Sequence, residues 1–154
     1  DLRGNPGGLV GEAVDVAGAF LPDDSEVVTT QGRRSPKETL STDGDPAVPD
    51  LPQLVLVDTG SASASEIVAG ALRDQNRAEI VGTATFGKAL VQSTVPLRDG
   101  GALKLTTARY LTPDGVDINE KGLDPDVRVA NDPDTEVDEA LRRALVLAAQ
   151  EGSK

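Results

Sequence analysis

The sequence has neither histidine nor cysteine among its 154 residues, and it also lacks methionine and tryptophan. Without histidine and cysteine, the chain has no Ser-His-Asp triad, no cysteine nucleophile and no zinc site of the usual His/Cys kind. A hydrolase of this composition must therefore activate its nucleophile with lysine, aspartate or glutamate. The absence of cysteine also excludes disulfides, and this leaves the redox compartment open.

Basic residues are in the minority, because 15 Lys and Arg stand against 26 Asp and Glu and the formal net charge is −11. We expect no nucleic-acid partner, since phosphate binding needs a basic stripe. No apolar run approaches the roughly 20 residues that span a bilayer, so we expect this chain to be soluble. We expect no cofactor and no metal, because the acidic run at residues 43–45 lacks the spacing and closing glutamate of a calcium loop.

Aromatic residues are nearly absent, since Phe20, Phe86 and Tyr110 are the whole set. The core must then consist of Val, Leu, Ile and Ala, and 38% hydrophobic residues make such a core feasible but lean. The length suits one domain. The chain opens on DLRGNPGG, with no initiator Met, no signal segment and no strand before it. We interpret the chain as a fragment of a longer protein.

Hydrophobic periodicity predicts an α/β fold with a βαβ unit in its centre. That unit consists of the unbroken apolar run 54–57, a helix whose apolar face runs from Ala64 to Leu72, and a returning strand at 78–81. Residues 32–52 hold three prolines in their second half and are predicted to be a long surface loop. Further helices are predicted at 9–21 and from 135 on, and further strands at 26–30, 90–97, 102–111 and 127–129. The pair 90–97 and 102–111 forms a β-hairpin.

The domain organisation that follows is a core over residues 1–130 and a C-terminal amphipathic helix over residues 131–154 that packs on it. Its predicted start is a capping box beginning at Thr135. The residues expected to form its core-facing stripe are Val137, Leu141, Ala144, Leu145 and Ala148.

Ser63 is the first candidate for chemistry, because it lies between a buried parallel strand and the first turn of the next helix. Ligands bind at that edge of open α/β sheets, and the free N–H groups of a helix start suit an oxyanion. The amide of Ala64 is the nearest such donor. Ser63 and Glu66 also fit a capping box, so the pattern alone favours Ser63 as only a helix cap.

Lys88 is the second candidate, and it follows a glycine that permits a bend before an apolar strand. A lysine acts as a general base only when it is neutral, and this requires burial or neighbouring dipoles. Gln92 lies four residues on, so in a strand it would share a face with Lys88 and orient it. Read alone, Lys88 and Gln92 are also ordinary surface residues. Gly7 and Gly8 open the first helix and predict either an anion cradle or only a tight turn.

Taken together, these segments resemble the C-terminal processing (tail-specific) serine proteases. The resemblance covers roughly residues 1–129, and the spacing between the motifs matches as well as their letters. The matching segments are DLRGNPGG (1–8), GSASASEI (60–67), TFGK (85–88) followed by Gln92, LKLTTARY (103–110) and KGLDPDV (121–127).

The resemblance implies a Ser/Lys dyad on a ClpP/crotonase-like α/β fold. The family's nucleophile is the middle serine of its Ser-Ala-Ser-Ala-Ser run, here Ser63, and its general base is the lysine 25 residues later, here Lys88. In many members a glutamine orients the lysine, and it corresponds to Gln92. The oxyanion hole is similar to one formed by the amide of Ala64 with that of Gly7 or Gly8.

The same resemblance implies substrates that are proteins cut near apolar C-terminal tails. It also implies that the parent protein carries a PDZ domain, is exported or membrane-anchored, and can form homo-oligomers. Asp74 matches an acidic family position, for which we expect a structural role. Two other functions stay open: a crotonase-like acyl-thioester enzyme, whose paired glutamates near the glycine loops we do not find, and a non-catalytic binding or scaffold module of the same fold.

Overall fold

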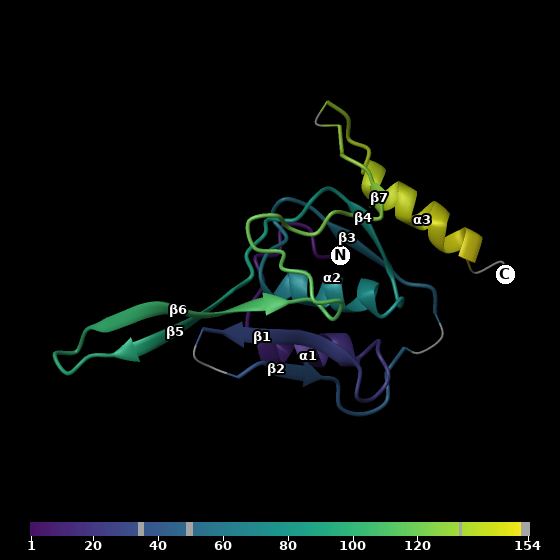
Figure 1. Cartoon of the computed structure of the whole chain (residues 1–154). Coiled ribbons are helices and arrows are strands. Elements are labelled where there is room, and N and C mark those ends of the chain that lie inside the picture. The colour runs from purple at the N-terminus through teal and green to yellow at the C-terminus, as the bar shows by residue number, and fades with distance from the viewer. Residues whose placement is uncertain (34–35, 49–50, 133, 152–154) are drawn as a thin grey trace.

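The computed structural model of the protein describes residues 1–33, 36–48, 51–132 and 134–151 (Figure 1). Seven strands and three helices lie in these ranges, and the fold is of the α/β class that the sequence predicts. The elements in chain order are α1 (Val10–Gly18), β1 (Glu26–Gly32), β2 (Glu38–Ser41), β3 (Leu54–Val57), α2 (Ala64–Asp74), β4 (Glu79–Gly82), β5 (Leu90–Pro96), β6 (Ala102–Leu111), β7 (Val127–Arg128) and α3 (Glu139–Glu151).

The strands form two sheets of different kind. The first is antiparallel, in the order β2-β1-β6-β5, and the second is parallel, in the order β3-β4-β7. In the parallel sheet β3 pairs with β4 from Leu54 opposite Glu79 to Val57 opposite Gly82. The predicted βαβ unit is therefore confirmed, with α2 as its crossover helix. Its carboxyl edge, where β3 leads into α2, is where ligands bind in sheets of this type.

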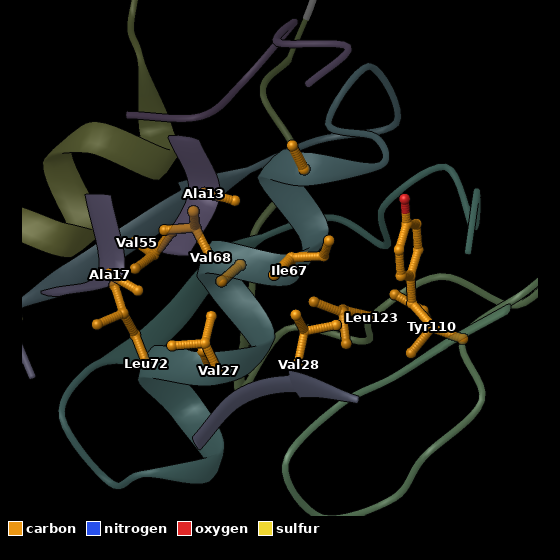
Figure 2. Packing of buried hydrophobic residues seen from close by; sticks show 14 of the residues in the cluster. Ala13, Ala17, Val27, Val28, Val55, Ile67, Val68, Leu72, Tyr110 and Leu123 are labelled. Atoms are coloured by element: carbon orange, nitrogen blue, oxygen red, sulfur yellow. The ribbon is translucent and has the colours of Figure 1, made fainter. Parts of the chain in front are cut away.

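Helix α2 is the centre of the core. Its residues from Ala64 to Leu72 are all buried, so this helix has no solvent face, as expected of a helix enclosed by other elements. It packs against α1, β1 and β4. Figure 2 shows Val68 and Leu72 of α2 among side chains from α1, β1 and β3, with Val27 and Val28 on the β1 side. Aliphatic side chains fill this core almost alone, as the composition requires.

Two predicted elements differ from the structure. The prediction of a loop over residues 32–52 is wrong for residues 38–41, which form β2 and pair with β1. These four residues are too few for an alternation of apolar and polar side chains to indicate a strand. The strand forms because it pairs with β1. Helix α1 ends at Gly18, four residues before Pro22, because the chain turns through bonds from Phe20 and Leu21 to the Ala17 carbonyl. Residues 34–35 and 49–50 of the predicted loop lie outside the described residues.

Helix α3 packs on the parallel sheet, where Ala140 and Ala144 form a second cluster with Leu56 and Val81. It begins at Glu139, later than predicted, because the Asp138 carboxylate accepts the N–H of Leu141 and so caps the helix. The predicted core-facing stripe is wrong for three of its members, since Val137, Leu141 and Leu145 are 46%, 40% and 63% exposed. None of the helices in the described ranges is long and apolar enough to cross a membrane.

The β5–β6 hairpin extends away from the body of the molecule (Figure 1). The predicted turn between its strands is confirmed by the bond from the Leu97 N–H to the Gly101 carbonyl. Only the far end of β6 enters the body, where it pairs with β1 and buries Tyr110. The hairpin therefore leaves the core where β5 begins, at Leu90, two residues after Lys88.

Asp138 links the two ends of the chain, and its contribution to stability should depend on pH. The Arg3 guanidinium, 2.7 Å away, and the Leu141 N–H lower the pKa of this carboxyl to about 2. A lowered folded-state pKa contributes stability that is present above the unfolded value near 4 and is lost as pH falls through the folded value. The melting temperature of Asp138→Asn should therefore lie below that of the native chain at pH 5, and this difference in melting temperature, the gap, should close toward pH 2. Asp124→Asn, which breaks the exposed pair with Arg128, should give a smaller gap. A gap for Asp138→Asn that is constant over this range would contradict the assignment.

Candidate active site at the start of helix α2

Ser63 ends a tight turn between β3 and α2. Its backbone has φ 56° and ψ −116°, a conformation that L-residues rarely adopt and that persists only where surrounding contacts enforce it. Ser63 is half-buried, whereas its neighbours Ser61 and Ser65 are buried. The hydroxyls of those neighbours donate to the carbonyls of Leu2 and Asn5. We call the turn between β3 and α2, residues 58–63, the elbow. Of the three serines in this run, Ser63 is thus the one that faces outward from it.

The N-terminal turn is fastened to this elbow by Asp58. One oxygen of its carboxylate accepts the amides of Gly4 and Gly60, each at 2.8 Å. Burial alone would raise the pKa of Asp58, but the amide donors of Gly4, Gly60 and Ser61 outweigh it and the pKa is lowered. Asp58 therefore stays ionised and holds residues 1–8 against the turn before Ser63.

Gly7 lies directly against the elbow. A Cβ at this position would lie 2.5 Å from the Ala62 carbonyl oxygen and 2.6 Å from the Ala64 nitrogen, and Gly7 has φ +85°. Only glycine allows this approach. The N–H of Gly7 is already used, because it donates to the Asn5 side-chain oxygen at 2.9 Å. The N–H groups of Gly8 and Ala64 donate no hydrogen bond within the part of the chain that the structure describes.

The carboxylate of Glu66 joins the elbow to the loop that carries Lys88. One oxygen accepts the N–H of Ser63 and the N–H of Lys88, each at 2.9 Å. The other accepts the Thr85 hydroxyl at 2.5 Å and the Gly87 N–H at 2.8 Å. Glu66 is completely buried. A buried charge is tolerated when its hydrogen-bonding positions are filled, and here four donors from two segments fill them.

A second layer supports the Lys88 loop from behind. Leu123 donates its N–H to the Thr85 hydroxyl at 2.7 Å, and Glu120 donates its N–H to the Gly87 carbonyl at 2.8 Å. Side chains along the loop alternate, so Thr85, Gly87 and Ala89 are buried while Phe86 and Lys88 are exposed. The segment KGLDPDV was notable in the sequence only because it matches the family. In the structure it supports this loop through Leu123.

The structure brings together the segments of Ser63, Ala64, Gly7, Gly8 and Lys88, and their backbones meet at the Glu66 and Gly7 contacts. Among the described residues, no hydrogen bond joins the Lys88 amine to the Ser63 hydroxyl. Gln92 is exposed on β5, which begins only at Leu90, so strand alternation does not extend back to Lys88. The orienting role of Gln92 stays a prediction.

Glu66 is the residue whose importance sequence reasoning missed. The sequence suggested only a capping box, and the half of that box that Glu66 supplies is present, because its carboxylate accepts the Ser63 N–H. Its wider role depends on Thr85, Gly87 and Lys88, about twenty residues further along the chain, which no local pattern connects to Glu66. The apolar pattern of α2 gives no signal either, because Glu66 lies off the face that this pattern marks and is buried only because other elements enclose the whole helix.

Other acidic residues have structural partners. Asp74 pairs with Arg73 at 3.1 Å and accepts the Asp114 N–H, in keeping with the structural role expected. In the 43–45 segment, the Gly44 N–H donates to Asp23. Over the described ranges no group of three or more His, Cys, Asp or Glu residues is arranged to hold a metal ion.

Replacing Glu66 should test how much the site depends on its carboxylate. In Glu66→Gln the amide NH2 faces two donors, so buried N–H groups lose their acceptor, and we expect the free energy of unfolding to fall by about 3 kcal/mol. Urea denaturation measures this. Glu79→Gln makes the same chemical change on an exposed residue of β4 and should shift the value by less than about 0.5 kcal/mol. Equal effects in the two variants would contradict the central role of Glu66.

Gly7→Ala should disrupt the contact with the elbow. The added methyl meets backbone atoms of Ala62 and Ala64 at a positive φ, so we expect a loss of at least about 2 kcal/mol in the free energy of unfolding. The control is Gly11→Ala on α1, where a Cβ meets nothing within 4 Å and alanine favours the helix. Differential scanning calorimetry compares them, and a Gly7→Ala variant as stable as Gly11→Ala would show that the close approach is wrong.

Sequence comparison gives the family context of this site. The profile of Peptidase family S41 matches residues 1–129. A carboxy-terminal-processing protease of Bartonella bacilliformis is 50% identical over 132 residues, which cover 84% of this chain and 30% of that protein. A carboxyl-terminal-processing protease of Synechocystis is 48% identical over 126 residues, covering 82% of this chain and 29% of that protein. The chain thus spans about 30% of the length of these curated relatives.

Comparison with solved structures also finds a C-terminal processing protease. A photosystem II D1 C-terminal processing protease matches with a TM-score of 0.81 and 41% identity, covering 94% of this chain and 37% of that protein. Tricorn protease matches with a TM-score of 0.67 at 17% identity, a likeness in fold alone. The elbow, its glycine turn and the lysine loop all lie within the matched residues 1–129, and the chain belongs to peptidase family S41.

Proposed function

We propose that this chain carries the catalytic centre of a serine endopeptidase of the C-terminal processing type, with Ser63 as nucleophile and Lys88 as general base. The observation that carries the proposal is the shared oxygen of Glu66, which accepts both the Ser63 and the Lys88 N–H. Two residues 25 positions apart are thereby held within two hydrogen bonds of each other. The absence of histidine leaves lysine as the base that fits the family.

The reaction begins when the neutral Lys88 amine accepts the proton of the Ser63 hydroxyl, and the oxygen attacks the scissile carbonyl carbon. The resulting oxyanion accepts hydrogen bonds from backbone amides at the helix start. The tetrahedral intermediate then collapses, the C–N bond breaks, and the Lys88 ammonium protonates the leaving amine. Water hydrolyses the acyl-enzyme by the same proton path in reverse, which regenerates Ser63.

The amides of Ala64 and Gly8 are the proposed oxyanion donors. The Ala64 N–H begins α2, where the helix dipole favours negative charge. Between the two glycines, Gly8 is favoured because the Gly7 N–H already donates to Asn5. Gly7 instead sets the distance at which Gly8 passes the elbow, since it lies against Ala62 and Ala64.

Lys88 must be shielded from water to act as a base, yet its side chain is exposed in this chain. We propose that bound substrate covers it and that Gln92 orients it at that stage. Phe86, 65% exposed two residues away, offers an apolar surface beside it. The alternative of a non-catalytic module with the same fold predicts that Lys88 stays solvated and Ser63 unreactive.

The wider context is also proposed. Relatives named for carboxyl-terminal processing support a substrate that is processed at its carboxyl terminus. We further propose that the tail near the cut is apolar and belongs to a protein. The longer parent would carry a PDZ domain, be exported or membrane-anchored, and form homo-oligomers. We assign the fold to the ClpP/crotonase-like group, on the βαβ unit and the glycine turn that meets its helix start.

The dyad is tested by hydrolysis of an unstructured protein that ends in an apolar tail. Ser63→Ala and Lys88→Ala should each lower kcat/KM by roughly 10³-fold or more, because each removes a group acting on the reacting atoms. Lys104→Ala on the exposed hairpin should leave the rate unchanged. A charged-tail version of the substrate should be cleaved more slowly. Cleavage that persists in Ser63→Ala would overturn the mechanism.

A further inference from the structure

A hollow of about 610 Å³ lies on the antiparallel sheet, and its lining comes from the end of β1, the start of β5 and the middle of β6. In β6, only residues 108–111 pair with β1, and beyond them the hairpin continues without that neighbour (Figure 1). The hollow includes Leu90, two residues after Lys88. The proposed mechanism uses Lys88 but leaves the hollow beside it without a role.

A β-bulge in β6 shapes the hollow. Val91 pairs with Ala108, but the next residue, Gln92, pairs with Thr106, so Thr107 is an extra residue in β6. A bulge of this kind bends its strand and re-aims side chains, and bulges are frequent beside active sites. The three β6 residues at the bulge all line the hollow. The recess therefore follows from a bend that is part of the sheet.

The lining is cationic, although the protein as a whole is acidic. Among the described residues that line the hollow are two arginines, Arg33 and Arg109, and no aspartate or glutamate. In the whole chain, acidic residues outnumber basic ones by 26 to 15. No carboxylate of the described residues forms an ion pair with Arg33. The hollow therefore attracts an anion on a molecule whose net charge repels one.

Arg109 is held in place with most of its guanidinium free. Its Nη1 donates to the Asp117 carboxylate at 2.8 Å, and that carboxylate also accepts the Asn119 N–H at 3.0 Å. Within the part of the chain that the structure describes, no hydrogen bond uses Nε or Nη2 of Arg109, and 61% of its side chain is exposed. A guanidinium presents its N–H donors in a planar fork that matches a carboxylate. Arg109 can therefore bind a second carboxylate while it keeps the first.

We propose that this hollow binds a carboxylate of the substrate segment that leaves with the amine. This rests on the proposed function. The Lys88 ammonium protonates the leaving amine, so that segment begins beside Lys88. Leu90 in the hollow is only about 7 Å from Lys88 on the rise of an extended chain. The carboxylate belongs to the chain terminus or to an acidic side chain, and either one fits the forks of Arg33 and Arg109. An apolar tail is compatible with this site, because its last residue carries a carboxylate.

Peptide binding tests the site without turnover. Ser63→Ala protein, labelled with nitrogen-15, is titrated with three N-acetylated peptides: Ala-Ala-Leu with a free carboxylate, Ala-Ala-Leu amide and Ala-Glu-Leu amide. We expect a peptide with a carboxylate to shift the amide signals of Gly32 and Ala108 and to bind at least about fivefold more tightly than the uncharged peptide. Whether the free terminus or the Glu side chain binds more tightly identifies the source of the carboxylate. Salt at roughly 0.5 M should weaken this binding, because both arginines are exposed.

Substitutions that remove one charge separate the hollow from general attraction. Arg33→Gln and Arg109→Gln should each weaken the carboxylate peptides by about three- to tenfold and leave the uncharged peptide unchanged. The matched control is Lys104→Gln, an exposed residue of β6 that does not line the hollow, and it should change these affinities by less than about twofold. Equal affinities for charged and uncharged peptides, equal effects of Lys104→Gln and Arg109→Gln, or no shift at Gly32 and Ala108 at millimolar peptide would overturn the inference.

Failure of this inference is distinct from failure of the proposed function, because the hollow is tested by binding and the dyad by hydrolysis. In the active protein, Arg109→Gln should raise KM for a substrate with a carboxylate in its leaving segment and leave kcat unchanged. An active protein whose KM ignores Arg33→Gln and Arg109→Gln would retain Ser63 and Lys88 and lose the hollow. Carboxylate-selective binding by a protein whose Ser63→Ala variant still cleaves would retain the hollow and lose the dyad.

Discussion

The site depends on one buried carboxylate. Glu66 has no access to water, and four donors from two separate segments surround it. A charge in that position is tolerated only while all its donors stay in place, so the elbow of Ser63 and the loop of Lys88 are fixed together or not at all. Backbone N–H groups supply three of the four hydrogen bonds. Glu66 therefore fixes the main chain of the two segments and leaves the side chains of Ser63 and Lys88 free.

A second constraint comes from what is missing at Gly7. The absence of a Cβ lets residues 5–8 lie against the turn before α2, and Asp58 holds the preceding residues there. The result is a helix start whose free amides face a crossing glycine segment, at the carboxyl edge of a parallel sheet. A hollow lined by Ala13 and Val68 lies at the same point.

The sequence predicted the parts of this site that are local. The run 54–57 and the face from Ala64 to Leu72 carry their own periodicity, so the βαβ unit and the position of Ser63 follow from pattern alone. The strand 38–41 depends on its pairing with β1, and the roles of Glu66 and Asp138 depend on partners further along the chain. Local pattern shows neither. The C-terminal helix shows a further limit, because periodicity finds an apolar face without saying whether a neighbour covers it. Leu141 and Leu145 are exposed, while the smaller Ala140 and Ala144 face the sheet.

The central claim is that the middle serine of three is the nucleophile and that Lys88 activates it. The most direct test treats the protein with a small fluorophosphonate and locates the adduct by mass spectrometry of its peptides. Our account predicts a single adduct on Ser63, formed far more slowly in Lys88→Ala, because Ser61 and Ser65 are buried and already donate to backbone carbonyls. An adduct on Ser61 or Ser65, or labelling of Ser63 at the same rate without Lys88, would contradict it.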